Sequence, residues 1–247
     1  MPQFFVDTSL AASKHVEIRG ADARHILQSL RLGQGDWMVL SDGKGRSFRA
    51  VIRQAKAMSV ILDIIEEITR VDPNPPPALA IASIRAERME WAIQKSVELG
   101  CRRILPFNSA RTVRKAEHAG SSRKIDRLRK IALEAAKQSG LPFVPSVEKA
   151  IDFLLLCSRL TEFKPALLLY EGEAALSIRK ALADADLSRE GIIIIGPEGG
   201  FTDEEVDQAR GKGALTASLG RQILKAETAA VAAVAIYQYE SGNTETV

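Results

Sequence analysis

The chain has 247 residues, of which 46% are hydrophobic and 26% are charged, so we expect a globular protein with one large domain or two ordinary ones. No apolar run reaches membrane-spanning length, and the first residues lack the features of a signal peptide, which predicts a cytoplasmic protein without a membrane partner. Two cysteines without metal-type spacing and three scattered histidines predict neither a disulfide framework nor a metal site.

The charge is unevenly distributed along the chain. The net charge is only +3, but residues 1–130 carry 23 Lys and Arg against 14 Asp and Glu, whereas residues 131–247 carry 11 against 17. The basic half is a candidate surface for a polyanion. An ordinary solvated surface explains the same asymmetry, and the charge alone leaves both interpretations open.

Residues 4–68 are predicted to form short strands around one helix. Two strand-like runs flank a Gly-rich turn within 37–52, which predicts a β-hairpin, and 59–68 is another β-rich run. The helix is predicted over 21–32. A small β-barrel is the natural closure of such a set. Four prolines within 71–77 then indicate a stiff linker between two domains.

After the linker, strands and helices alternate. The predicted strands cover 78–84, 102–107, 165–172, 191–196 and 214–220. The predicted helices cover 87–100, 121–140 and 225–240, and a further helix opens on the acidic run at 202–205. This alternation predicts a mostly parallel sheet with helices on both faces. Trp37 and Trp91 are predicted to lie in the core.

Three loops follow predicted strands at the edge where α/β sheets bind ligands. They contain Gly172, the Gly-Pro-Glu-Gly-Gly sequence of 196–200, and Gly220. Glycines allow a ligand to approach the backbone closely. The 196–200 loop has no Walker lysine, and Glu198 would repel a phosphate, so an adenine nucleoside suits these loops better than a nucleotide. Glycine-rich segments are also ordinary turns, and the pattern alone does not decide between the two.

Two adjacent motifs carry a resemblance to a known family. "IGPEGGFTDEEV" (195–206), followed by "LGRQILKAETAAVAA" (219–233), resembles the signature of the RsmE-type ribosomal RNA methyltransferases of the SPOUT superfamily. Other segments resemble the family's blocks in the same order, namely 24–36, 88–100, 109–113 and 134–140. Members of this family use S-adenosylmethionine to methylate N3 of a uridine in 16S ribosomal RNA.

The resemblance implies an α/β fold with two domains. Residues 1–70 would form a PUA-like β-barrel that binds RNA, 71–77 the Pro-rich linker, and 78–247 a SPOUT methyltransferase domain tied in a trefoil knot. The implied partners are 16S ribosomal RNA or the small ribosomal subunit, and a second copy of the chain, bound through the knotted domain. Nothing in the resemblance implies a metal.

The resemblance also implies site residues. Glu227 is the candidate proton acceptor or orienter, and Arg221 the candidate cation near the base or its phosphate. The implied cofactor-binding residues are Leu169, Tyr170, Glu171, Gly172, Gly196, Pro197, Glu198, Gly199, Gly200, Leu219, Gly220, Gln222, Ile223, Leu224 and Ala229. The implied RNA-binding residues are Arg24, His25, Arg31, Arg88, Lys95, Arg111, Arg114 and Lys115. Glu227 could instead complement a helix N-terminus, and Arg221 could be a solvated loop residue.

The chain departs from the family pattern at three positions. Lys225 and Ala226 stand where the family usually has Arg and Thr, and Leu141 stands where it often has Arg. Lysine keeps the charge but loses the planar fork of arginine. These departures leave open a protein that binds RNA without catalysis through a degenerate knot. Ribose 2′-O-methylation of RNA, within the same superfamily, is a second alternative.

Overall fold

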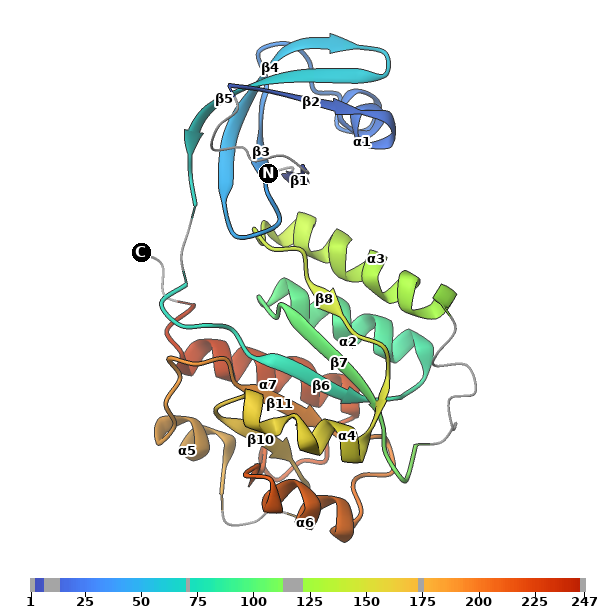
Figure 1. Ribbon diagram of the computed structural model, residues 1–247, viewed down its shortest axis with the longest axis vertical. Coiled ribbons are helices and arrows are strands. Elements are labelled where there is room, and N and C mark those ends of the chain that lie inside the picture. The colour runs from blue at the N-terminus through green and yellow to red at the C-terminus, as the bar shows by residue number, and fades with distance from the viewer. Residues whose placement is uncertain (1–2, 7–13, 70–71, 113–121, 173–175, 245–247) are drawn as a thin grey trace. The chain divides into compact units, whose positions relative to one another are not determined.

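The computed structural model describes residues 3–6, 14–69, 72–112, 122–172 and 176–244. The chain divides into two compact units (Figure 1). Unit 1 contains residues 1–71 together with 136–144, and unit 2 contains residues 72–135 and 145–247.

Unit 1 is built on a five-stranded sheet with the order β1-β3-β4-β5-β2. Its strands are β1 Gln3–Phe5, β2 His15–Arg19, β3 Trp37–Ser41, β4 Ser47–Lys56 and β5 Ser59–Glu67. The antiparallel pairing of β3 with β4 confirms the predicted hairpin. β1 pairs in parallel with β3, and the remaining pairs are antiparallel.

The helical segment of unit 1 lies over this sheet's core. It consists of α1, Gly20–Arg24, and a π-helical turn, His25–Ser29. Ile26 is fully buried, and Leu27 and Leu30 pack against the same apolar cluster. The helix predicted over 21–32 is therefore present, with its helical residues at 20–29.

A segment from the middle of the chain completes unit 1. The Gln3 side-chain amide donates to the Leu141 carbonyl at 2.7 Å, the Ser41 hydroxyl donates to the Pro142 carbonyl at 2.9 Å, and Lys44 forms a β-bridge with Phe143. These residues lie within the range that the sequence assigns to the second domain. No local pattern distinguishes them, because the hydrogen bonds that hold them join residues 101 and 138 positions apart.

Unit 2 is built on a seven-stranded parallel sheet with the order β12-β10-β11-β6-β7-β8, and β9 also pairs with β7. The strands are β6 Ala78–Ala82, β7 Arg103–Asn108, β8 Ser146–Val147, β9 Ile151–Asp152, β10 Ala166–Leu169, β11 Ile192–Ile195 and β12 Leu215–Ala217. Every pairing in it is parallel. The predicted parallel sheet is thus confirmed.

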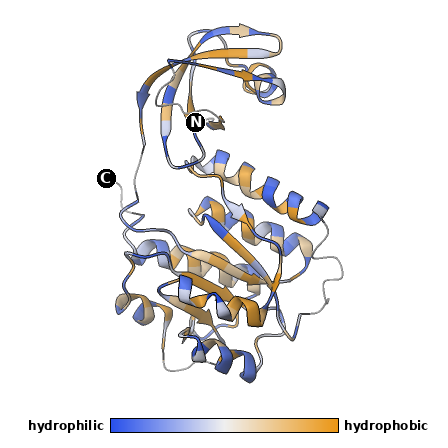
Figure 2. Ribbon diagram, in the orientation of Figure 1, coloured by the Kyte–Doolittle hydropathy of each residue, from blue (hydrophilic) through white to orange (hydrophobic). Residues whose placement is uncertain are grey.

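Helices cover both faces of this sheet because its central strands are apolar throughout. They are α2 Ala86–Glu98, α4 Phe153–Ser158, α5 Ile178–Ala183, α6 Asp203–Gly211 and α7 Ala226–Glu240, with a short 3₁₀ turn at Leu160–Glu162. A further helix, α3 Ser122–Ser139, follows β7 in the chain, and its last residues, 136–139, belong to unit 1. All four residues of β11 are buried, and the central strands are orange in Figure 2. Ile192 and Ile194 pack with α4 and α6, whereas α7 covers β11 together with α2.

The prediction that the two tryptophans lie in the core is wrong. Trp37 and Trp91 are 37% and 44% exposed. Trp37 starts β3 on the outward side of the strand alternation, where the Arg49 guanidinium lies 4.7 Å from its ring centroid. Trp91 lies on α2 away from the buried positions, such as Ala92 and Ile93.

The Pro-rich segment makes specific hydrogen bonds within unit 2. The backbone amide of Asn74 donates to the Asn243 side chain in the C-terminal turn, and its side-chain amide donates to the Ser241 carbonyl. The Asn243 side-chain amide donates in return to the Asn74 carbonyl. The same turn is held from the other side, because Gln238 of α7 receives the Asn243 amide at 2.8 Å and donates to the Leu99 carbonyl at 2.7 Å. The end of α7 is thus anchored both to this segment and to the end of α2.

Gly100 supplies a test of this anchor. Its φ of +99° favours glycine, and a Cβ there would collide with the Gln238 amide. We expect Gly100→Ala to lower the free energy of unfolding by about 1–3 kcal/mol. Gly211→Ala is the control, since its Cβ meets open space at the end of α6, and it should be neutral or stabilise by up to about 1 kcal/mol. Urea denaturation measures both, and equal midpoints for the two variants would contradict the anchor.

Candidate functional site

A cavity of about 280 Å³ lies at the carboxyl ends of the central strands of unit 2. It is formed by the ends of β10 and β11, the loops that follow them, the segment that leads into α7, and one residue of α2. Its lining consists of Arg88, Leu169, Glu171, Ile195, Gly196, Pro197, Glu198, Gly200, Phe201, Ile223, Leu224, Lys225, Ala226 and Ala229. Parallel strands end at the same edge of a sheet, which is why loops distant in sequence meet here.

The loop after β11 is a tight turn that only glycine permits at its end. The Gly200 amide donates to the Pro197 carbonyl at 2.9 Å, and Gly200 has a φ of +69°. A Cβ at this position would collide with the Glu171 carboxylate from the loop after β10. Thr202 then caps α6 in a capping box with Glu205, which fixes where the turn ends.

Arg88 joins two carboxylates at the cavity. Its Nη1 atom lies 3.2 Å from Glu198 Oε1, and its Nε atom lies 3.6 Å from Glu227 Oε1. The Glu227 side chain is only 14% exposed. Its other oxygen, Oε2, is buried and has no hydrogen-bond partner in the part of the chain that the structure describes. A buried acceptor without a donor is costly, so a group that donates to this oxygen would stabilise it. Glu227 itself does not line the cavity, but its partner Arg88 does.

The loop after β10 is tied to the start of α6. The Tyr170 hydroxyl donates to Asp203 Oδ1 at 3.1 Å, and this hydrogen bond raises the pKa of the Tyr170 phenol above its ordinary value. The Tyr170 ring lies against Gly172, where a Cβ would come within 2.5 Å of it. Tyr170 and Gly172 therefore shape the rim and do not line the cavity.

The loop after β7 approaches the same turn from another direction. Arg111 donates from Nη1 to the Gly199 carbonyl at 3.1 Å, and its Cβ would lie 3.2 Å from a Cβ at Gly199. A cation is therefore held beside the Gly-Pro-Glu-Gly-Gly turn. The site thus combines glycine-lined backbone, a buried carboxylate and nearby cations, an arrangement suited to a polar organic ligand and an anionic substrate.

Comparison with known proteins identifies the family. A family model described as an RNA methyltransferase domain matches residues 72–238. The chain belongs to this family. It is 30% identical over 244 residues to the ribosomal RNA small subunit methyltransferase E of Rickettsia conorii, with 94% of this chain and 93% of that protein covered. It is 28% identical over 250 residues to the same protein of Bacillus subtilis, with 98% and 97% covered.

Solved structures of relatives share the fold over nearly the whole chain. The crystal structure of a ribosomal RNA small subunit methyltransferase E from Neisseria gonorrhoeae, bound to S-adenosyl methionine, matches with a TM-score of 0.82 and 30% identity. The match covers 97% of this chain and 97% of that one. The resemblance found in the sequence is therefore confirmed at the level of family and fold.

The structure brings most of the expected cofactor residues of this methyltransferase together. Nine of them line the cavity: Leu169, Glu171, Gly196, Pro197, Glu198, Gly200, Ile223, Leu224 and Ala229. Six lie outside its lining: Tyr170, Gly172, Gly199, Leu219, Gly220 and Gln222. The lining also includes Ile195, Phe201, Lys225 and Ala226, which were not predicted to bind the cofactor although all four lie within the two motifs.

The residues expected to bind RNA are dispersed. Arg24, His25 and Arg31 are exposed in unit 1, where Arg31 has a φ of 55°, an uncommon value for a residue other than glycine. In unit 2, Lys95 pairs with Glu98 at 2.8 Å, and Arg88 lines the cavity. Arg114 and Lys115 lie outside the described residues. Arg221, the expected catalytic cation, is exposed in the loop after β12 and does not line the cavity.

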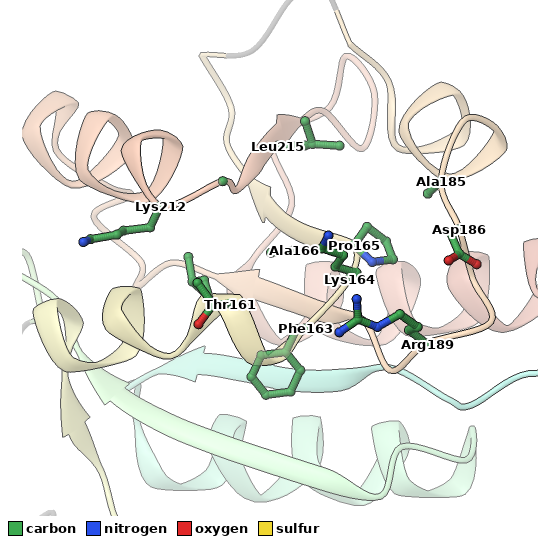
Figure 3. Close-up of a pocket in the computed structure, with 12 residues that line it drawn as sticks. Thr161, Phe163, Lys164, Pro165, Ala166, Ala185, Asp186, Arg189, Lys212 and Leu215 are labelled. Atoms are coloured by element: carbon green, nitrogen blue, oxygen red, sulfur yellow. The ribbon is translucent and has the colours of Figure 1, made fainter.

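A larger cavity, of about 640 Å³, lies at the opposite edge of the sheet (Figure 3). Pro165, Ala166 and Leu215 place it at the amino ends of β10 and β12, with Lys164 and Arg189 at its rim. Ligands of α/β sheets bind beyond the carboxyl ends of the strands. The smaller cavity, which contains the glycine turn and Arg88, the partner of the buried Glu227 carboxylate, is therefore the candidate active site.

Other chemistries find no support among the described residues. No group of three or more His, Cys, Asp or Glu residues is arranged to hold a metal ion there. Burial raises the pKa of the Cys101 thiol to about 12 and that of the Cys157 thiol to about 11, so neither is a ready nucleophile.

Among the described residues, no helix has the length and apolar character needed to span a bilayer.

Proposed function

We propose that the protein transfers a methyl group from S-adenosylmethionine to N3 of a uridine in the 16S RNA of the small ribosomal subunit. Membership of the RNA methyltransferase family and its small-subunit relatives support the reaction class. The observation that carries the assignment to this cavity is the buried Glu227 carboxylate, which pairs with Arg88 of the lining and has one oxygen without a hydrogen-bond partner among the described residues.

The chemistry of the cavity fits S-adenosylmethionine. Its volume of about 280 Å³ lies near the lower end of ligand cavities, roughly 300–1,000 Å³. Glu171 and Glu198 line it, and they would disfavour a nucleoside phosphate but not a cofactor that carries a sulfonium cation and no phosphate. The glycine turn and the apolar side chains of Leu169, Ile223 and Leu224 would hold the adenosyl group, and the residues at the rim would close around it.

The cofactor, when bound, supplies an electrophilic methyl group. Methylation at N3 then requires removal of the imide proton and alignment of the nitrogen with the methyl group. Glu227 Oε2 is the proton acceptor in this proposal, and Arg88 holds the other oxygen so that the carboxylate keeps its orientation. Arg221 would stabilise the anionic uracil or its phosphate from the loop after β12.

The uridine must be unpaired or extruded, because N3 lies on the pairing edge of the base. Arg111 beside Gly199 would bind the adjacent backbone. The exposed Arg24, His25 and Arg31 would extend the contact over unit 1, and Lys95, Arg114 and Lys115 complete the proposed set. Most of the RNA-binding free energy from these residues would be electrostatic and independent of base sequence.

The proposal includes a trefoil knot and a PUA-like barrel. Residues Ile223–Ala226 line the same cavity as the loops after β10 and β11, and α7 then packs on β11 and α2. The meeting of this C-terminal segment with two earlier loops at one cavity supports a knot. The five strands of unit 1 around one apolar core support the barrel. A crystal structure with cofactor tests both.

Gly200→Ala tests the cofactor site. The new methyl group would force apart the Gly200 turn and Glu171, so we expect the affinity for S-adenosylmethionine to fall at least about tenfold, or about 1.4 kcal/mol. Gly213→Ala is the matched control, because Gly213 also has a positive φ but faces open space away from this cavity. Calorimetry measures both affinities; equal affinities in the two folded variants would show that the cofactor binds elsewhere.

Glu227→Gln tests the proton acceptor. The substitution preserves size and removes the charge, so RNA and cofactor should bind nearly normally while single-turnover methylation falls by about 10²–10⁴-fold. Glu204→Gln, at the exposed start of α6, should be nearly silent. A full rate for Glu227→Gln on bound RNA would mean that the carboxylate only complements the α7 N-terminus.

The product nucleoside tests the target atom. Mass analysis of it should give 3-methyluridine, and a 2′-O-methylated ribose would contradict the proposed target atom.

Assembly is a further test of this function, since a homodimer through unit 2 is part of the proposal. The buried face of α7 carries Ala230, Val234 and Tyr237, yet its remaining surface is also apolar, with Val231 half-buried and Tyr239 71% exposed. Sedimentation should give about twice 26.9 kDa, and Val231→Glu should shift the protein toward the monomer. A parental monomer that still methylates RNA would refute the dimer.

A further inference from the structure

Glu205 is a buried carboxylate that the proposed reaction does not use. It is 6% exposed, and three hydrogen bonds reach its two oxygens. The Ala110 amide donates to Oε1 at 2.9 Å, the Ser109 hydroxyl to Oε2 at 3.1 Å, and the Thr202 amide to Oε2 at 3.0 Å. The capping box of α6 accounts for the contact with Thr202 but for neither of the other two.

The two further contacts join loops that the sheet itself leaves separate. Ser109 and Ala110 follow β7, whereas Glu205 belongs to the helix that follows β11. The strand order β11-β6-β7 places β6 between them, so the two strands are about 10 Å apart. Glu205 therefore spans the end of β6 and ties the loop after β7 to the glycine turn.

The tied loop is short and internally braced. Thr112 Oγ1 accepts from the Ser109 amide at 3.0 Å, and the Thr112 amide donates to the Ser109 carbonyl at 3.1 Å. Arg111 lies between these residues and reaches the Gly199 carbonyl. Arg111 uses one of its five N–H donors in this contact, which leaves others to bind a phosphate. Its place beside the cavity therefore depends on the backbone that Glu205 holds.

We propose that Glu205 is a positioning residue for the RNA substrate: it holds segment 109–112 so that Arg111 binds a phosphate next to the reacting uridine. The proposal rests on the proposed methylation of RNA. Glutamine at position 205 would replace one carboxylate oxygen by an NH₂ group. That group would face one of the three donors that now bind the carboxylate, and two buried donors that face each other are unfavourable. The loop after β7 should then leave the glycine turn.

A double-mutant cycle on the full-length protein tests the coupling. Anisotropy of a labelled fragment of small-subunit ribosomal RNA is measured over a salt series. We expect Arg111→Ala to lower the slope of log affinity against log salt by roughly 0.7–0.9, and Glu205→Gln to lower it by about as much. The slope of the double variant should fall by no more than the larger of the two single losses, because both changes remove the same contact between Arg111 and the phosphate. Additive losses would overturn the proposal, as would an unchanged slope in Glu205→Gln.

Three controls separate this role from helix stability. Thr202→Ala removes the hydroxyl that caps α6 but keeps the contacts of Glu205 with Ser109 and Ala110, so the salt slope should stay parental. Ser109→Ala keeps the cap and removes one of those contacts, so it should lower the slope even if Glu205→Gln fails to fold. Glu204→Gln removes an exposed charge one residue away and should change nothing. A loss of slope in Thr202→Ala equal to that in Ser109→Ala would make Glu205 only a cap.

Amide exchange separates failure of this inference from failure of the proposed function. Hydrogen exchange at Ala110 should accelerate about tenfold in Glu205→Gln, whatever the protein's substrate. If the parental protein neither binds nor methylates the RNA, the proposed function and the RNA role of Glu205 are both refuted. Accelerated exchange in the variant would still show that Glu205 holds the loop after β7. Unchanged exchange in a folded Glu205→Gln would refute the hold itself. Calorimetric affinity for S-adenosylmethionine should remain within about twofold of the parental value, because Glu205 does not line the cavity.

Discussion

The parallel register of β10, β11 and β12 is the constraint on which the site depends. Each strand begins at the amino edge of the sheet and ends at the carboxyl edge, so the loop after β10, the glycine turn after β11 and the segment after β12 must emerge side by side. The cost of placing unpaired backbone in a protein interior is avoided because these loops meet at the surface edge. Four consecutive buried isoleucines in β11 make this register stable, since covering them requires helices on both faces.

Electrostatics then distinguish the two ends of the candidate site. Glu198 and Glu227 would repel each other if left alone, and Arg88 between them offsets that repulsion. One Glu227 oxygen still has no hydrogen-bond partner among the residues that the structure describes. Arg111 stands at the other side of the glycine turn, held against Gly199. The proposed proton transfer would use the buried Glu227 carboxylate, and the proposed RNA contact would use Arg111 beside the glycine turn.

Much of this arrangement was predictable from local patterns. The hairpin of β3 and β4, the parallel sheet and the helix at 225–240 all follow from short-range periodicity and turn residues, and the structure confirms them. The loops carrying Glu171, Gly196 and Ile223 were identified because glycines follow apolar strands at the expected edge. The tryptophans show the limit of such reasoning. Tryptophan is a large apolar residue of the kind found in cores, but the position of Trp91 on α2 lies away from the buried face of that helix.

The sequence by itself determined the longer strands and helices of the second unit, because each is a contiguous segment with a regular period. Its motifs, through their resemblance to a known family, also indicated the family and most residues that line the cavity. Short elements such as β8, β9, α4 and α5 were not predicted. Tertiary structure alone decided which distant groups meet. Arg88 was expected among RNA contacts, yet it pairs with Glu198 and Glu227, residues 110 and 139 positions later. Segment 136–144 joins unit 1, and Glu205 reaches across the end of β6 to Ala110. These contacts depend on chain topology, and no local period encodes the distance between two loops that meet only when the sheet has formed.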